Sequence, residues 1–263
     1  MSRLVQSSIY TMVIVLLVSW ASLSTARQKD FDWSQWQTLL ESNIKTTTRE
    51  GIKINGVDYK ALRSGRKSKK GFDFVLDKLA SFDPTTLSGK AKLSFWINVY
   101  NVGAVKMILD HPGITSINDA VAKPGAVWKT KVISVGGKPY SLDEIENQIL
   151  RPMGDPRIHF AIVCASVSCP DLVPEIYRPE SLDEQLESQV IRMLGNPDKG
   201  LSVEPNTRNL KLSRIFQWFE KDFGGTTGII AFIEQRAKAL SLPGGWHNFK
   251  VEFLNYNWNL NKL

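Results

Sequence analysis

Both cysteines of the chain and one of its three histidines lie within the stretch His159-Phe-Ala-Ile-Val-Cys164-Ala-Ser-Val-Ser-Cys169-Pro. A thiolate is a strong nucleophile and an imidazole is its usual base, so these residue types can perform acyl transfer through a covalent intermediate. Cys169 precedes Pro170, at a turn or a helix start, where main-chain amides lower the pKa of a thiol. We therefore expect Cys169 to be the nucleophile and His159 its base.

The geometry of a strand limits this pairing. Residues 158–166 read as a buried strand, in which alternation sends the side chains of His159 and Cys164 to opposite faces. Cys164 stands among apolar neighbours and is expected to be an inert core thiol. A straight strand would leave Cys169 ~30 Å from His159. Their contact therefore requires a sharp reversal of the chain after Ser166.

Other interpretations of the segment stay open. Two cysteines of an exported protein can form a Cys164–Cys169 disulfide, which needs α-carbons ~4.4–6.8 Å apart. A zinc site with His159, Cys169 and a third ligand has less support, because no CxxC or HExxH spacing accompanies it. We expect no metal and no cofactor. A purely structural role is the last alternative.

Polar and aromatic residues elsewhere can complete a site. Asn98 and Asn101 share one face of a buried helix, where amides must find hydrogen-bond partners. They either cap neighbouring loops or line a polar pocket and stabilise an oxyanion. Glu146 follows the capping box Ser141-Leu-Asp-Glu144 and can orient a histidine. The tryptophans at 128, 218, 246 and 258 can bind sugar rings, although their scattered positions favour core packing.

Periodicity places the elements around these residues. The central helix is apolar on nearly its whole circumference, which is typical of a helix at the centre of a core. Mixed order and short strands predict a single α+β domain, with that helix on a small mixed or antiparallel sheet. The predicted helices span 32–44, 71–82, 88–111, 142–150, 181–194, 213–219 and 226–240; the hairpins and strands span 52–59 (turning at Asn55-Gly56), 131–140, 158–166, 201–204, 209–212 and 249–255.

The first 26 residues have the layout of a secretory signal peptide. Arg3 is their only charged residue, an apolar core spans 9–20, and Ser24-Thr25-Ala26 supplies small residues before the cleavage point. An uncleaved inner-membrane anchor is the alternative, and it would be the chain's only contact with a membrane. We expect a periplasmic or secreted protein, with an N-terminal extension of the domain at 27–87 and the core at 88–263.

The charge of the chain gives little information about its partners. The formal net charge is +7. The densest basic run, residues 63–70, has no interleaved aromatic residue and is typical of a solvated loop. We expect no nucleic-acid partner, since a nucleic-acid reader gathers its charge on one element. The expected partner is an unidentified ligand or protein of the cell envelope.

Four separated motifs resemble the domain of unknown function 547 family from about residue 90 to 261. They are residues 95–101 (FWINVYN), 141–151 (SLDEIENQILR), 157–170 (RIHFAIVCASVSCP) and 256–261 (YNWNLN). No biochemical activity is established for that family, and a papain- or transglutaminase-like architecture is its implied distant relation. Asn147 stands where family members often have His, which weakens any mechanism that needs that imidazole. The resemblance implies that the polar site residues are Asn98, Asn101, Glu146, Arg151, His159, Cys164 and Cys169.

Two hypotheses about function follow. In the first, the protein is a cysteine-dependent hydrolase or acyl transferase of the envelope. Cys169 attacks a carbonyl, His159 is the base, Glu146 orients it, and Asn98 or Asn101 stabilises the oxyanion. In the second, it is a non-catalytic binding or structural module in which Cys164 and Cys169 are paired.

Overall fold

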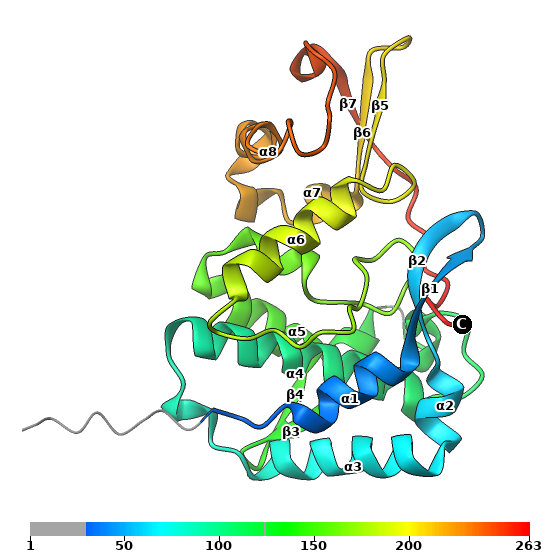
Figure 1. Ribbon diagram of the computed structural model, residues 1–263, viewed down its shortest axis with the longest axis vertical. Coiled ribbons are helices and arrows are strands. Elements are labelled where there is room, and N and C mark those ends of the chain that lie inside the picture. The colour runs from blue at the N-terminus through cyan, green and yellow to red at the C-terminus, as the bar shows by residue number, and fades with distance from the viewer. Residues whose placement is uncertain (1–29, 124) are drawn as a thin grey trace, which may run out of the picture.

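The computed structural model describes residues 30–123 and 125–263 (Figure 1). The predicted signal peptide lies outside the described residues. The helices are α1 (Ser34–Asn43), α2 (Tyr59–Ser64), α3 (Arg66–Ser81), α4 (Gly89–Asp110), α5 (Leu142–Glu144), α6 (Leu182–Leu194), α7 (Arg214–Trp218) and α8 (Gly225–Glu234). The strands are β1 (Ile44–Arg49), β2 (Ile52–Val57), β3 (Lys131–Val135), β4 (Lys138–Ser141), β5 (Leu201–Glu204), β6 (Asn209–Leu212) and β7 (Lys250–Phe253).

Helix α4 is the centre of the fold, as its sequence predicts. Every residue from Leu93 to Val105 is buried. The helix packs on β3 through Gly103, where a Cβ atom would lie 3.2 Å from Leu142 and 3.4 Å from Val132. A glycine costs helix stability, so its position here reflects the close approach of the hairpin. In Figure 1, α1, α3 and α4 all lie in the lower part of the molecule, and α3 contacts α1, α2 and β3.

The first hairpin turns at a different place from the one expected. Strands β1 and β2 pair from Ile44–Val57 to Arg49–Ile52, so the turn is Glu50-Gly51. Both turn residues have positive φ, 51° and 84°, as a type I′ turn requires. The predicted turn residues Asn55 and Gly56 instead lie within β2. The glycine leaves room for the Leu263 side chain, since a Cβ atom at Gly56 would lie 2.6 Å from it.

Two apolar clusters form the interior. The larger surrounds α4 and extends from Trp33 to Leu186, so the predicted extension at 27–87 packs into the same core as α4. The second cluster lies between α6, α7, α8 and the β5–β6–β7 sheet, at the top of Figure 1. Two segments contribute to both clusters: in α6, Leu186 belongs to the first and Val190 to the second, and in the short segment before residue 161, Ile158 belongs to the first and Phe160 to the second.

That segment is not the strand predicted at 158–166. It is a 3-10 helix, Pro156–Phe160, followed by turns. Asp155 caps the helix by accepting a hydrogen bond from the Arg157 amide, and Pro156 occupies the first turn. Both are start signals for a helix. The apolar run that follows is buried by the elements around it and not by strand pairing. Its apolar composition is nevertheless typical of a buried strand, and the prediction of a strand rested on this composition.

The α+β class is confirmed, with three separate small sheets. Strands β1–β2 and β3–β4 are antiparallel hairpins, and β5–β6–β7 is a mixed sheet with a parallel β6–β7 pair. The other predicted elements are present, although α3 begins at Arg66 and α8 ends at Glu234. Within the described part of the chain, none of the helices has the length and apolar character needed to cross a membrane.

The Asn98 amide gives a test of this core. Asn98 Nδ2 donates to the Tyr177 carbonyl at 2.8 Å, and the Tyr177 amide donates to Asn98 Oδ1 at 3.0 Å. We expect Asn98→Ala to lower the free energy of unfolding by about 2–4 kcal/mol, because it leaves two buried main-chain groups unpaired. Chemical denaturation measures this change. Asn206→Ala, at an exposed position, should change stability by less than about 0.5 kcal/mol; equal effects of the two substitutions would contradict the assignment.

Candidate functional site

One cavity of about 340 Å³ brings together the predicted thiols, imidazole and carboxylate. It lies between α4, the π-helical turn Ile145–Leu150, the loop after Phe160, α7 and residues 254–263, hereafter the C-terminal segment. The lining residues are Tyr100, Gly125, Trp128, Lys129, Asp143, Glu146, Asn147, His159, Ile162, Cys164, Cys169, Pro170, Ile215, Trp218, Phe219, Tyr256 and Trp258.

Residues 161–170, hereafter the cysteine loop, are anchored to α4 by one side chain. Asn101 Nδ2 donates to the Ala161 carbonyl at 3.0 Å, and the Val163 amide donates to Asn101 Oδ1 at 3.0 Å. The chain then reverses through Ala165, whose φ is 60°. Positive φ is strained for a residue with a Cβ atom and concentrates at functional sites. The chain thus reverses one residue before the expected place, and the reversal brings Cys169 against Cys164. Among the described residues, no hydrogen bond joins Cys169 to His159.

The C-terminal segment holds the outer side of the cysteine loop. The amides of Val167 and Ser168 donate to the carbonyls of Asn259 and Asn257, and the Asn261 amide donates to the Ala165 carbonyl. The motif at 256–261 therefore lies directly against the motif at 157–170.

Cys164 is the more accessible thiol, and it is surrounded by hydrogen-bonding groups. Its Sγ lies 3.0 Å from Ser166 Oγ and 3.1 Å from Tyr256 Oη. Burial raises the pKa of this thiol, but hydrogen bonds with Cys169, Ser166 and Tyr256 outweigh it and lower the pKa to about 7. A substantial fraction of Cys164 is thus thiolate near neutral pH.

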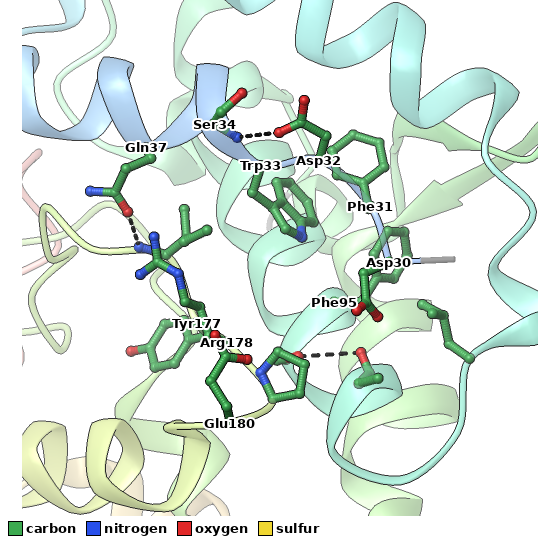
Figure 2. Close-up of a pocket in the computed structure, with 15 residues that line it drawn as sticks. Asp30, Phe31, Asp32, Trp33, Ser34, Gln37, Phe95, Tyr177, Arg178 and Glu180 are labelled. Carbon is green, nitrogen blue, oxygen red and sulfur yellow. Dashed lines mark hydrogen bonds between the residues drawn. The ribbon is translucent and has the colours of Figure 1, made fainter. Parts of the chain in front are cut away.

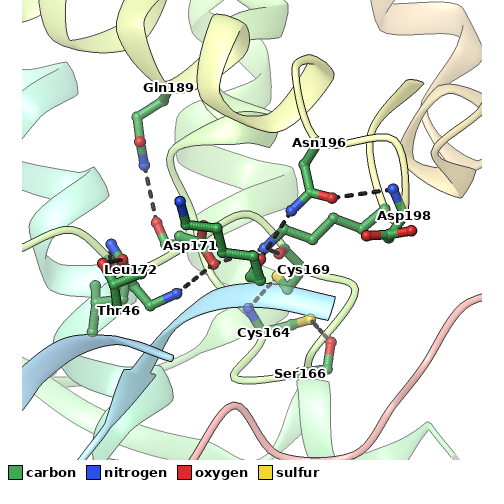
Figure 3. Close-up of polar contacts among 12 residues, drawn as sticks. Thr46, Cys164, Ser166, Cys169, Asp171, Leu172, Gln189, Asn196 and Asp198 are labelled. Carbon is green, nitrogen blue, oxygen red and sulfur yellow. Dashed lines mark hydrogen bonds and ion pairs between the residues drawn. The ribbon is translucent and has the colours of Figure 1, made fainter. Parts of the chain in front are cut away.

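Cys169 has the opposite environment. It is buried, its Sγ accepts a hydrogen bond from the Cys164 amide at 2.8 Å, and both cysteines are free thiols (Figure 3). Burial raises its pKa well above the ordinary value, and the adjacent Cys164 raises it further. From the sequence, Cys169 is expected to be the reactive thiol and Cys164 an inert one. The contacts and exposure of the two side chains favour the reverse.

A buried lysine supports the turn at Cys169. Lys199 Nζ donates to the Cys169 carbonyl at 3.0 Å and pairs with Asp171 Oδ1 at 2.7 Å. Asp171 Oδ1 also accepts from the Asn55 amide, so the turn is tied to strand β2. A buried charge of this kind needs such partners, since an unpaired ammonium would be very costly. The ion pair therefore fixes the inner end of the cysteine loop.

His159 is held in one orientation by Asp222. Its Nε2 lies 2.8 Å from Asp222 Oδ2, and its ring stacks on Phe219 at a centroid distance of 3.8 Å. Burial lowers the pKa of His159 to about 4, although Asp222 acts to raise it. The imidazole is thus neutral at pH 7, and an Nε2–H that donates to Asp222 leaves Nδ1 as a proton acceptor. Nδ1 has no hydrogen-bond partner among the described residues.

Arg151 holds the Asp222 carboxylate of this pair. Its Nε and Nη2 donate to the two carboxylate oxygens of Asp222 at 2.6 and 2.7 Å. This bidentate bond is among the strongest between side chains, and it orients the carboxylate. It also lowers the pKa of Asp222, so the group stays ionised. Arg151 is not itself a lining residue of the cavity, and its contacts are those of a positioning residue.

Glu146 completes the polar side of the cavity. Its Oε1 lies 3.8 Å from His159 Nδ1, and Tyr100 donates to its Oε2 at 3.3 Å. Burial raises the pKa of Glu146 to about 7, despite the opposing effects of Tyr100 and Arg151. The role of orienting His159, expected for Glu146, is performed by Asp222. Glu146 is instead a carboxyl group that is partly protonated at neutral pH.

The two asparagines do not act on an oxyanion in this arrangement. Both amides are buried and are used at both ends by main-chain groups, of Tyr177 for Asn98 and of the cysteine loop for Asn101. Of the two open alternatives, the contacts match the capping of neighbouring loops. Neither residue lines the cavity.

A second cavity, of about 440 Å³, lies between the start of α1, α4 and residues 176–180 (Figure 2). Gln37 Oε1 accepts from the Ile176 amide at one side of it. No thiol or imidazole of the described chain lines this cavity. The chemistry predicted from the sequence is thus gathered in the cavity at Cys164.

Three functional side chains were not identified from the sequence. Asp222 lies 63 residues from His159 in a short Glu-Lys-Asp turn, and nothing local marks it. Ser166 lies within the resembling motif as an ordinary polar residue. Tyr256 opens the closing motif, whose position in the resemblance was the only available signal.

No group of three or more potential metal ligands occurs among the residues the structure covers.

Residues 84–193 match the sequence model of a family described as protein of unknown function, DUF547, which confirms the resemblance inferred from the first three motifs. The closing motif lies beyond the matched range. No curated protein and no solved structure matches the chain.

The raised pKa of Glu146 predicts a pH-dependent stability. A carboxyl with a pKa of about 7 when folded and 4.5 when unfolded binds more protons in the folded state. Its contribution to the free energy of unfolding is therefore lost as pH rises through 7. Relative to Glu146→Gln, the wild type should lose up to about 3 kcal/mol of unfolding free energy between pH 4.5 and 8. Denaturant titrations across this range measure the difference. A difference that does not vary with pH would contradict the raised pKa.

Proposed function

We propose that the protein is a cysteine-dependent hydrolase or acyl transferase whose nucleophile is Cys164, not Cys169. One observation carries this proposal. The same cavity holds a thiol with a pKa of about 7 and a buried imidazole whose Nδ1 has no partner in the described chain. Asp222 holds that imidazole through its other nitrogen. A nucleophile, a base and a group that orients the base are the components of covalent acyl transfer.

The reaction has two steps. The Cys164 thiolate attacks the carbonyl carbon of an ester or amide, and the alcohol or amine leaves as the carbonyl–heteroatom bond breaks. Glu146 in its protonated form donates a proton to this leaving group, and a thioester remains on Cys164. Water then attacks the thioester. His159 Nδ1 takes one proton of this water, the remaining hydroxide bonds to the acyl carbon, and the carbon–sulfur bond breaks to release a carboxylic acid and the thiolate. The proton then passes from His159 Nδ1 to the Glu146 carboxylate, whose Oε1 lies 3.8 Å away, so both groups return to their starting forms.

The protonation states near pH 7 suit these roles. A neutral His159 can accept a proton, and a Glu146 with a pKa near 7 can donate one. Glu146 meets the condition that the pKa of a general acid lie close to the working pH. His159, with its lower pKa, contributes an unprotonated Nδ1 that Asp222 holds in place. Tyr256 and Ser166 can both donate hydrogen bonds to the thiolate sulfur.

The cellular setting is part of the proposal. The N-terminal layout supports export, with cleavage after Ala26 and residence in the periplasm or outside the cell. The substrate is then a ligand or protein of the envelope. An oxidising compartment also allows a Cys164–Cys169 disulfide, the state that the non-catalytic alternative requires.

Thiol reactivity tests the assignment of the nucleophile. With iodoacetamide under native conditions, we expect Cys164 to be alkylated at least about tenfold faster than Cys169, because it is more exposed and more ionised. The rate should rise with pH around an inflection near 7. Mass spectrometry of peptides from timed samples measures both rates. In the same samples, faster labelling of Cys169 or a quantitative disulfide would contradict the proposal.

Catalysis is tested with 4-nitrophenyl acetate. Cys164→Ala should abolish hydrolysis and the acetylated protein species. Asp222→Asn should slow hydrolysis by at least ~10²-fold by changing the proton position on His159. Lys221→Ala, exposed beside Asp222, is the matched control and should be unchanged. Full hydrolysis by Cys164→Ala would sink the mechanism.

Export predicts the first residue of the mature protein. Expressed in a bacterium with its own N-terminus, the chain should appear in the periplasmic fraction beginning at Arg27. Ala26→Arg should prevent cleavage, because position −1 requires a small residue. N-terminal sequencing of the fractionated protein measures this. An intact Met1 in the cytoplasmic fraction would refute export.

A further inference from the structure

The cavity has a second feature besides its thiol. We propose that it binds a saccharide that carries an acyl group, with the sugar ring stacked on a wall of aromatic side chains beside Cys164. The acyl part of this inference rests on the function proposed above, whereas the saccharide part rests on the aromatic wall.

The tryptophans of the described chain fall into two groups. Four of them, at positions 33, 36, 96 and 246, are buried to 8% exposure or less. The other three, Trp128, Trp218 and Trp258, are partly or fully exposed, and all three line this cavity. Trp218 is 44% exposed. Exposed aromatic surface gathered at one cavity indicates a binding site.

These rings form one continuous wall. Trp218 and Trp258 stack with centroids 5.7 Å apart and an interplanar angle of 26°. Tyr256 lies 4.5 Å from Trp258, and Trp128 lies 6.4 Å from it. The rings come from a 3-10 turn, from α7 and from the C-terminal segment. Trp128 packs on the larger core, whereas Trp218 and Trp258 belong to neither cluster, so core packing does not account for the position of these two rings.

The wall ends at the nucleophile. Tyr256 Oη lies 3.1 Å from Cys164 Sγ, while the Tyr256 ring contacts both Trp218 and Trp258. A ring lying on this wall would therefore hold its substituents next to the sulfur. Such placement of a carbonyl beside a nucleophile is what lowers the entropic part of a reaction barrier.

The polar lining favours a neutral, hydroxylated ligand. Lys129, Asp143 and Asn147 also line the cavity, so besides Glu146 its lining carries one lysine and one aspartate, whose charges offset. Asn147 Nδ2 donates to Asp143 Oδ1 at 3.0 Å, which places amide and carboxylate groups together. These groups exchange hydrogen bonds with hydroxyls. A polyanion would need more cations, and a quaternary ammonium would need a cage of ring faces and carboxylates without the lysine.

The chemistry then has a defined leaving group. The thiolate attacks the ester carbonyl, the carbon–oxygen bond to the sugar breaks, and the sugar oxygen takes the proton from Glu146. Water completes the cycle as described above and releases the acid. The products are a free sugar hydroxyl and a carboxylic acid.

Saccharide binding is tested with triacetylchitotriose, which is neutral and stacks through its ring faces. We expect binding, measured by titration calorimetry and by a change in tryptophan fluorescence. Trp218→Ala should weaken it at least about fivefold, and Trp218→Phe should restore most of the loss because it keeps a ring face. Phe74→Ala, at a 50% exposed position of α3, is the control and should bind normally. Thermal melting shows whether each variant is folded.

The outcomes separate this inference from the proposed function. Cys164→Ala should bind the saccharide as the wild type does, even though it hydrolyses no ester. If it still hydrolyses, the catalytic proposal fails and the saccharide site stands. Absence of triacetylchitotriose binding at millimolar concentration, equal binding by Trp218→Ala, or binding of octanoate or choline in its place would overturn the saccharide assignment.

Discussion

The double hydrogen bond from Asn101 to the cysteine loop is the contact on which the site depends. It replaces the strand pairing that the main chain of Ala161 and Val163 would otherwise need, so the loop can leave the extended conformation. Helix α4 can offer this amide only because it is buried on all sides, with a polar group facing the loop. The freed chain can then reverse at Ala165 and bring Cys169 back against Cys164.

Burial acts in different directions on the titratable groups of the cavity. It disfavours the charged form of each, so it lowers the pKa of His159 and raises those of Glu146 and Cys169. Cys164 is the exception because hydrogen bonds with Cys169 and with the hydroxyls of Ser166 and Tyr256 stabilise its thiolate. Asp222 is less buried and remains ionised through Arg151. One low-dielectric cavity thus holds a neutral imidazole, a partly protonated carboxyl and a partly ionised thiol near pH 7.

His159 stands where the two apolar cores of the molecule meet. Its neighbours Ile158 and Phe160 are packed into different cores, which leaves little freedom for the short helix that carries it. Asp222 is positioned by elements of the second core. Cys164 is positioned by the cysteine loop, which packs on the first core. The arrangement of His159, Asp222 and Cys164 therefore depends on the relative position of the two cores. The C-terminal segment strengthens this by pairing with the cysteine loop while placing Tyr256 and Trp258 at the cavity.

The sequence by itself determined the α+β class, the buried helix α4, the hairpin at 131–140, and the family resemblance, which the match at residues 84–193 confirms. It also identified His159, Glu146 and the two cysteines, because these features depend on local periodicity, capping and motif order. Only the tertiary structure decided which thiol is accessible, that Asp222 holds His159, and that Asn98 and Asn101 bond the main chain. These depend on contacts between residues far apart in the chain. The strand predicted at 158–166 failed for the same reason, since burial and hydrogen bonds supplied by α4 override the extended preference of an apolar run.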